Sequence, residues 1–102
     1  MQHPDILIAG AGIIGLSLAL ELHRRGLAVT VLEAGQPLAQ ASTAAAGMLA
    51  ADDPHNPPAL HPLAQLSTRL FPGYLDRIEA LSGTRVAFQT TSTLQALSLI
   101  HI

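Results

Sequence analysis

Three glycines and the strand before them have the residue types and spacing that could bind phosphate. Gly10, Gly12 and Gly15 form the pattern G-x-G-x-x-G directly after the apolar run Ile6–Ala9. In such a pattern the first glycine permits a tight turn, the second lets the backbone approach a pyrophosphate, and the third lets a helix lie close to the strand. The phosphates would bind free N–H groups at the positive end of the helix dipole.

Glu33 supplies the second half of a dinucleotide-binding pattern. It closes the apolar run 28–32, 18 residues after Gly15 and 23 after Gly10. A carboxylate at this strand end can accept both ribose hydroxyls of an adenosine, and its charge would repel a 2′-phosphate, which disfavours NADP. The alternative is a structural turn followed by an ordinary surface glutamate. The strand, the turn, the helix and the acid together favour dinucleotide binding.

The elements that must position these residues follow from the apolar periodicity. Residues 5–33 are typical of a strand, a helix and a second strand, with apolar helix positions at Ile14, Leu18 and Leu22. We expect the helix to begin near Ile13 and to end near Gly26.

An alanine-rich segment of small residues, 34–51, follows the second strand. It allows two interpretations: a flexible loop or alanine helix, or a backbone that passes close to a flat ligand. In the second interpretation Ser42 and Thr43 offer hydroxyl groups, and Gly47 leaves room for the ligand. The spacing alone does not decide between them.

The second half of the chain predicts a long helix. Asn56 and Pro57 have the types expected at an N-cap and a first helical position, and the apolar positions then continue over residues 59–81. Pro72 and Gly73 should kink this helix or split it in two. A strand is expected around 86–97. The apolar positions of the helix are Leu60, Leu63, Leu66, Leu70, Leu75, Ile78 and Leu81.

Composition excludes several classes of function. The 102 residues contain no cysteine, which rules out disulfides, thiolate metal sites and thiol catalysis, and the scattered arginines form no basic stripe for nucleic acid. The N-terminus lacks a basic targeting region and the apolar runs are too short to span a bilayer, so we expect a soluble, cytoplasmic protein. His55 and His61 with Asp52 and Asp53 match no zinc spacing, and a polar linker explains them as well.

The run Ala41–Ala50, together with the glycine turn and Glu33, resembles the start of glycine oxidases of the thiamine-biosynthesis type, in the D-amino-acid oxidase superfamily. Residues 66–71 and 79–83 are similar to further signatures of this family, and the resemblance covers about 5–96. It implies an α/β fold: the N-terminal part of a Rossmann-like FAD-binding domain, with a doubly wound, mainly parallel sheet that this chain leaves incomplete.

The resemblance also implies a division of the chain and a set of flavin-nucleotide contacts. Residues 1–97 would form the N-terminal part of the domain, with a βαβ start at 5–33, a flavin loop at 41–50, a helical region at 59–82 and late strands at 85–97. Ser92 stands where the family usually has glycine, and residues 98–102 depart from the family and are interpreted as a non-native tail. The cofactor-binding residues would be Gly10, Gly12, Ile13, Ile14, Gly15, Glu33, Ala34, Ser42, Thr43, Ala46, Gly47, Met48 and Leu49.

The activity that the resemblance implies is FAD-dependent oxidation of glycine or another small (D-)amino acid or amine to the imino acid, with O₂ reduced to H₂O₂. Substrate-binding residues of the family lie farther downstream, so we assign no catalytic residue and no metal ligand, and we expect the 102-residue chain to be inactive by itself. Alternatives are a sarcosine oxidase or D-amino-acid dehydrogenase of the same superfamily, or a nucleotide-binding module without catalysis. The expected partners are the substrate and O₂, with a second copy of the chain in a homo-oligomer as a further candidate partner.

Overall fold

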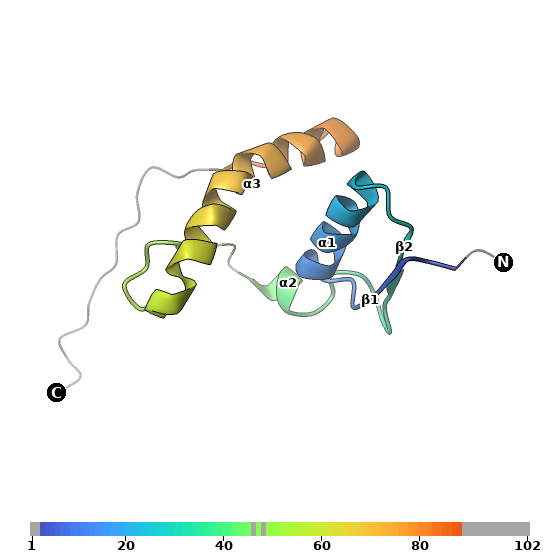
Figure 1. Cartoon of the computed structure of the whole chain (residues 1–102), viewed down its shortest axis with the longest axis horizontal. Helices are drawn as coiled ribbons and strands as arrows, with labels where there is room; N and C mark the ends of the chain where they lie inside the picture. Colours follow the sequence, from blue (N-terminus) through green and yellow to red (C-terminus); the bar gives the residue numbers. More distant parts are fainter. Residues whose placement is uncertain (1–2, 46, 48, 89–102) are drawn as a thin grey trace. The chain divides into compact units, whose positions relative to one another are not determined.

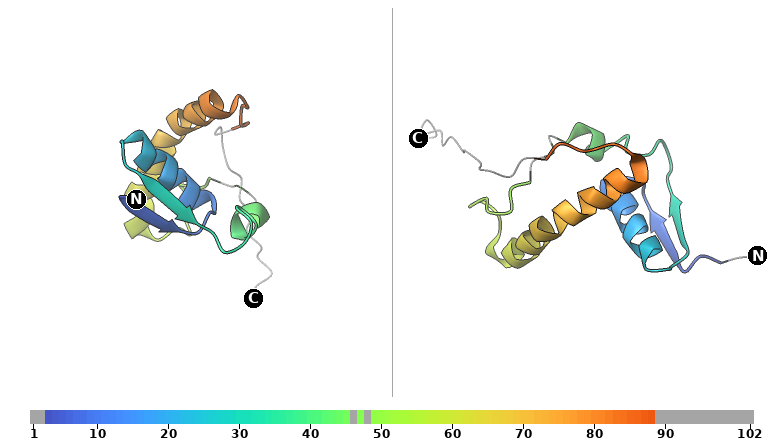
Figure 2. Two further views of the ribbon diagram at one scale, coloured as in Figure 1. Left: turned by 90° about the vertical axis from the view of Figure 1, so that its right-hand side faces the viewer. Right: turned by 90° about the horizontal axis from the view of Figure 1, so that it is seen from above.

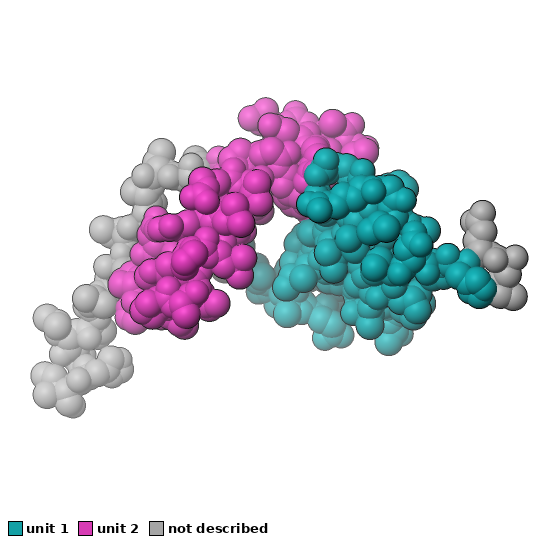
Figure 3. Space-filling model, in the orientation of Figure 1, with its two compact units in different colours: residues 1–47 teal, residues 48–102 magenta. Residues whose placement is uncertain are grey.

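The chain folds into two compact units, residues 1–47 and residues 48–102, coloured separately in Figure 3. A computed structural model describes residues 3–45, 47 and 49–88. In chain order the elements are the strand β1 (Ile6–Ala9), the helix α1 (Ile13–Arg24), the strand β2 (Val29–Leu32), the short helix α2 (Ala41–Ala44), the 3₁₀ turn η1 (Pro58–Leu60) and the helix α3 (His61–Ser82), as Figure 1 shows.

The first unit is built on the predicted strand–helix–strand start. β1 and β2 are parallel, paired from Ile6 with Val29 to Ala9 with Leu32. α1 connects them and packs along one face of the pair (Figure 2). A parallel pair needs such a crossover because the chain must return to the same end of the sheet. The α/β fold class is confirmed.

The core of the first unit is small. Among the described residues only Ile8 and Ala11 are buried, with 8% and 3% of their surface exposed. Leu7 and Leu32 lie on the opposite side of their strands from Ile8 and are more than half exposed. Ile14, which the periodicity places on the apolar face of α1, is 82% exposed. Its side chain is therefore not part of the contact between α1 and the sheet.

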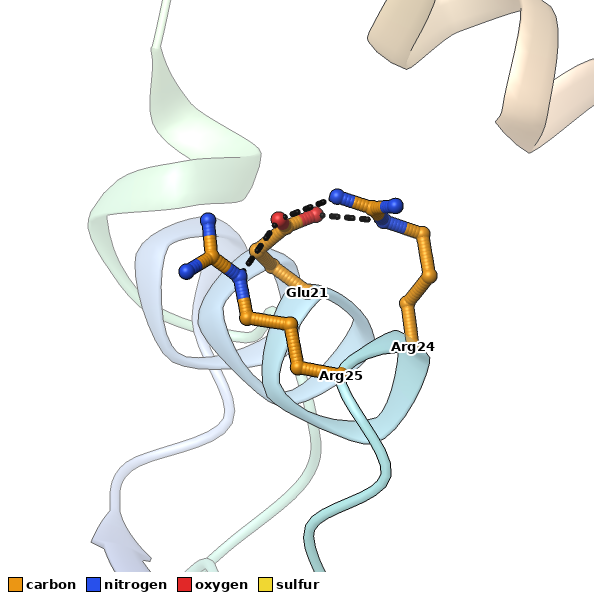
Figure 4. Close-up of polar contacts among 3 residues, drawn as sticks. All are labelled: Glu21, Arg24 and Arg25. Atoms are coloured by element: carbon orange, nitrogen blue, oxygen red, sulfur yellow. Dashed lines mark hydrogen bonds and ion pairs between the residues drawn. The ribbon is translucent and has the colours of Figure 1, made fainter.

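The end of α1 carries a cluster of charges that agrees with its expected stop near Gly26. Arg24 forms a two-bond ion pair with Glu21, with N···O distances of 2.6 and 3.0 Å, and Arg25 binds the same carboxylate at 3.0 Å (Figure 4). The hydrogen bonds to Glu21, and then its charge, raise the pKa of the Arg24 guanidinium. Gly26 follows with a φ of 86°, a left-handed conformation that suits glycine after a helix.

The alanine-rich segment contains one short helix between turns. It is neither a continuous alanine helix nor a plain loop, because only Ala41–Ala44 are helical and Ala45 returns to an extended conformation. The interpretation that its backbone passes close to a ligand stays a prediction. The residues before it, 34–40, form bends and turns.

The helix of the second unit begins later than the proline pattern predicts. The prediction that Asn56 is its N-cap is wrong: the 3₁₀ turn starts at Pro58 and α3 at His61. Asn56 instead donates its side-chain N–H to the carbonyl of Ala50, at 2.8 Å. Pro57 has an extended ψ of 131°, so the helix cannot start until the residue after it.

α3 runs without interruption from His61 to Ser82 and is not split at Pro72. Proline removes the bond to the carbonyl four residues earlier and its ring crowds that carbonyl, which bends a helix without ending it. Figure 1 shows that α3 changes direction along its length. Its apolar positions divide: Leu75 and Ile78 are partly buried, whereas Leu60, Leu63, Leu66, Leu70 and Leu81 are exposed. Gly83, with a φ of 73°, ends the helix.

Residues 84–88 form no strand, and the rest of the strand expected at 86–97 lies outside the described residues. Phe88 nevertheless contacts the helix, with its ring centroid 5.0 Å from that of Phe71. Within the described part of the chain, no helix is both long enough and apolar enough to cross a membrane.

Candidate nucleotide-binding site

The glycine turn joins β1 to α1, and two of its glycines are demanded by the backbone. Gly10 has a φ of 104°, a conformation that side chains rarely allow, and its N–H donates to the carbonyl of Leu32 at 2.7 Å. A Cβ on Gly15 would lie 2.1 Å from the carbonyl oxygen of Gly10. These contacts agree with the turn and helix-packing roles that the sequence predicts for the two residues.

Gly12 is different, because the fold alone does not require glycine there. It precedes α1 with a φ of −80°, which any residue can adopt. An added Cβ would meet the hydroxyl oxygen of Ser42 at 3.2 Å, a tight contact with a small side chain. The missing side chain leaves the backbone open at the helix start, as close approach of a phosphate would need.

Glu33 lies at the carboxyl end of β2 and bonds to the turn across the sheet. Its Oε1 accepts the N–H of Ala11 at 3.1 Å, and its Oε2 accepts the N–H of Gly35 at 3.1 Å. The N–H groups of Gly35, Ala11 and Ala34 stabilise the ionised form of the Glu33 carboxyl and lower its pKa. Desolvation acts in the opposite direction but does not cancel this lowering. A carboxylate has about four acceptor positions, so acceptors remain for other donors.

Ser42 brings the alanine-rich segment to the same turn. Its hydroxyl oxygen accepts the N–H of Ile13, the first residue of α1, at 2.9 Å. The adjacent Thr43 donates its hydroxyl to the carbonyl of Leu38. The hydroxyls that the sequence singled out therefore hold α2 beside the start of α1.

Three backbone donors at the turn stay open. Among the described residues, no acceptor is found for the N–H of Gly12, Ile14 or Gly15, whereas Ala11 and Ile13 bond to Glu33 and Ser42. Free N–H groups at a helix start favour an anion, because the helix dipole adds to their partial charges. The turn can therefore accept a phosphate without breaking an existing bond.

The remaining predicted contacts are less well placed. Ala34 and Gly47 are exposed in the first unit, Ala46 and Met48 lie outside the described residues, and Leu49 belongs to the second unit. Asp53 and His55, part of the metal alternative, contact each other at 3.1 Å. In the described ranges, no three histidine or acidic side chains gather closely enough to hold a metal ion.

Sequence reasoning missed three residues that shape the site. Ala11 and Gly35 bond to Glu33 through their backbone, which no side-chain pattern reveals. Leu38 has a φ of 63°, unusual for a leucine, and its N–H donates to the carbonyl of Ala11 at 2.9 Å. A leucine gives no sign of such a conformation, although the neighbouring Pro37 marks a turn.

Comparison with known families gives this geometry a context. Residues 5–98 match the model of a family described as FAD dependent oxidoreductase. The chain belongs to this family. The predicted cofactor, FAD, is thereby confirmed, and so is the interpretation of the fold as the N-terminal region of an FAD-binding domain.

Individual relatives carry more specific names. The chain is 42% identical over 85 residues to the bifunctional protein ThiO/ThiG of Trichormus variabilis, covering 82% of this chain and 13% of that protein. It is 36% identical over 80 residues to a glycine oxidase of Geobacillus kaustophilus, covering 78% and 21%. A tRNA 5-methylaminomethyl-2-thiouridine biosynthesis bifunctional protein MnmC of Polaromonas naphthalenivorans is 38% identical over 90 residues, covering 87% and 14%. The chain thus spans about a fifth or less of each relative.

The residues present fit the nucleotide half of FAD. Its pyrophosphate needs N–H donors and room beside the backbone, which Gly12 and the start of α1 offer. Its adenosine ribose needs an acceptor, which the ionised Glu33 offers at the end of β2.

Proposed function

We propose that residues 5–47 bind the adenosine and pyrophosphate of FAD, with the open N–H groups of Gly12 and Ile14 at the phosphates, Ile13 between them, and Glu33 at the ribose. The observation that carries this assignment is the convergence of one carboxylate, one hydroxyl and open N–H groups on a single turn. Ser42, Thr43 and Gly47 would line the same nucleotide. Ala34, Ala46, Met48 and Leu49 are proposed as further contacts on the resemblance alone.

We further propose that the whole protein is a glycine oxidase-like enzyme acting on glycine or a small (D-)amino acid or amine, linked to thiamine biosynthesis. When bound, FAD would supply the redox chemistry, a two-electron oxidation of the substrate with O₂ as the final acceptor and H₂O₂ as the second product. This chain's residues hold the nucleotide end of the cofactor. The names of the Trichormus and Geobacillus relatives support the proposal.

The segment does not distinguish between the substrates of its relatives. The glycine oxidase and the MnmC relative match the same segment at similar identity, 36% and 38%, although their names describe different substrates. This segment therefore indicates which cofactor is bound and does not indicate the substrate. A sarcosine oxidase or a D-amino-acid dehydrogenase would need the same FAD-binding segment.

The test is made on a protein of the relatives' length that carries this segment. We expect it to retain FAD through purification and to release H₂O₂ with glycine, sarcosine or D-alanine as the substrate. Turnover with an artificial electron acceptor but not with O₂ would indicate a dehydrogenase. Purification without flavin, and no flavin uptake when FAD is added, would reject the proposed function.

A further inference from the structure

Glu33 makes contacts that its proposed role at the ribose does not need. Both of its carboxylate oxygens accept a backbone N–H, from Ala11 on one side and Gly35 on the other, each at 3.1 Å. Ala11 lies 22 residues earlier in the chain and is the most buried residue described, with 3% of its surface exposed. The carboxylate therefore bonds the end of β2 to the middle of the glycine turn.

The bond completes the fixation of Ala11. The carbonyl of Ala11 accepts the N–H of Leu38 at 2.9 Å, and the preceding Gly10 donates to Leu32 at 2.7 Å. With Glu33 on its N–H, both backbone groups of Ala11 are held by the segment around the end of β2. The next residue is Gly12, whose open N–H belongs to the proposed phosphate site, so its position depends on how Ala11 is held.

Only a carboxylate of this length can make both bonds at once. A glutamine offers a single acceptor oxygen, and its NH₂ group would face one of the two N–H donors. A buried N–H that loses its acceptor costs free energy, and the backbone would turn to satisfy it. Losing the acceptor should cost more at the Ala11 N–H than at the Gly35 N–H, because Ala11 is buried and water cannot easily replace the carboxylate there.

We propose that Glu33 is a positioning residue of the phosphate turn: it holds Ala11, and through it Gly12, in the phosphate-binding arrangement before any nucleotide arrives. The inference rests on the proposed function for the identity of the ligand. A role at the ribose alone and a positioning role predict different results for one ligand. With the positioning role, Glu33 should affect the binding even of a nucleotide that has no ribose hydroxyls.

The test compares ADP with 2′,3′-dideoxy-ADP on the apoprotein of full length. If Glu33 acts only at the ribose hydroxyls, Glu33→Gln weakens ADP and leaves the dideoxy compound unchanged. The proposal predicts that the variant weakens 2′,3′-dideoxy-ADP by about threefold to tenfold, and ADP by more. An unchanged dissociation constant for the dideoxy compound would overturn it.

Asp5 provides the matched control. Its Oδ2 accepts the N–H of Ala28 at 2.8 Å, and its own N–H donates to the carbonyl of Ala28 at 2.8 Å. The contact is thus the same kind of carboxylate bond between the two strands, at the end away from the turn. Asp5→Asn should leave both dissociation constants unchanged. Equal losses in the two variants would mean a general weakening of the sheet and would contradict the proposal.

Hydrogen exchange without nucleotide separates the two claims. We expect exchange of the Ala11 amide to be faster in Glu33→Gln than in the original protein, and unchanged in Asp5→Asn. If neither nucleotide binds the original protein, the proposed function fails, while faster exchange still supports the positioning role. Unaltered exchange at Ala11 in Glu33→Gln would reject that role whatever the nucleotides do.

Discussion

In the first unit, three polar side chains bond backbone groups more than 20 residues away along the chain, whereas the described side-chain bonds of the second unit join close neighbours. The bonds from Glu33, Ser42 and Asp5 span 22, 29 and 23 residues. In the second unit, the bonds made by Asn56, Thr68 and Ser82 span six, four and four residues. The first unit therefore fixes its own tertiary geometry around the turn, although it buries very little apolar surface.

The second unit shows what local bonds alone provide. α3 has a regular backbone and a glycine stop, but Leu63 and Leu70 remain more than 60% exposed. A helix is set by its own sequence, whereas the burial of its apolar face depends on other elements. The contacts that build the candidate site come from residues of the first unit.

The largest expected difference between the units is in the free energy of unfolding after a glycine is replaced by alanine. Gly15→Ala in α1 places a Cβ 2.1 Å from a backbone oxygen that cannot move freely, so we expect it to lose about 3 kcal/mol or more, or to prevent folding of the first unit. Gly73→Ala in α3 meets no atom within 4 Å and should gain about 0.5–1 kcal/mol from helix propensity. Chemical denaturation measures both. Equal changes in stability at the two sites would contradict the close approach of Gly15 in α1 to the carbonyl of Gly10.

Acid should release the bond between Glu33 and Ala11. Because the folded state lowers the pKa of this carboxyl below its ordinary value of 4.5, its contribution is complete above that pH and is lost as the pH falls through the folded pKa. The amide proton resonances of Ala11 and Gly35 should therefore shift together below about pH 4.5. Independent titration of the two amides, or a midpoint above 4.5, would show that they do not share this carboxylate.

The ion pairs at the end of α1 should matter less. Glu21→Gln breaks both contacts to Arg24 and Arg25, but both arginines are more than half exposed. Exposed pairs are screened by water and salt, so we expect the midpoint of thermal unfolding to fall by about 1–4 °C at low salt. The difference should vanish near 1 M NaCl. A loss that persists at high salt would mean a structural role for this carboxylate.

The smallest stability change is expected from the exposed leucines of α3. In the 102-residue chain, Leu63→Ala should change the free energy of unfolding by less than about 0.5 kcal/mol, because the side chain is 65% exposed. Ile8→Ala, in the buried face of β1, should cost about 2–4 kcal/mol. Comparable losses at the two positions would show that the face of α3 is covered in solution.

The sequence predicts the start of the fold well because its signals are local. The apolar run of β1, the glycines of the turn and Gly26 after α1 each constrain the backbone within a few residues, and the observed bounds agree. Asn56 shows the limit: it has the type of an N-cap, yet its amide bonds to Ala50. Pro57 is extended and precedes a second proline, Pro58, so the helical conformation begins only at Pro58. The N-cap pattern alone does not predict this later start.

The candidate site is predictable in its residues but not in their contacts. The motif singles out Gly12 and Glu33, and the resemblance singles out Ser42, yet neither indicates that Glu33 accepts the N–H of Ala11 or that Ser42 accepts the N–H of Ile13. Those bonds depend on the register of β1 with β2 and on the left-handed turn at Leu38. Both are tertiary features, which a one-dimensional pattern does not encode.

The central claim is that the turn before α1 binds the pyrophosphate of FAD, and Gly12 tests it most directly. Gly12 has a φ open to any residue, so Gly12→Val should preserve the secondary structure and fill the space beside the phosphate. The control Gly73→Val adds the same side chain to α3, where an added Cβ has no contact within 4 Å apart from the adjoining helix backbone. The measurement is the dissociation constant of FAD for the full-length apoprotein, with circular dichroism to verify folding. We predict a loss of about tenfold to hundredfold or more for Gly12→Val and none for Gly73→Val; a folded Gly12→Val protein that binds FAD as tightly as the original would contradict the account.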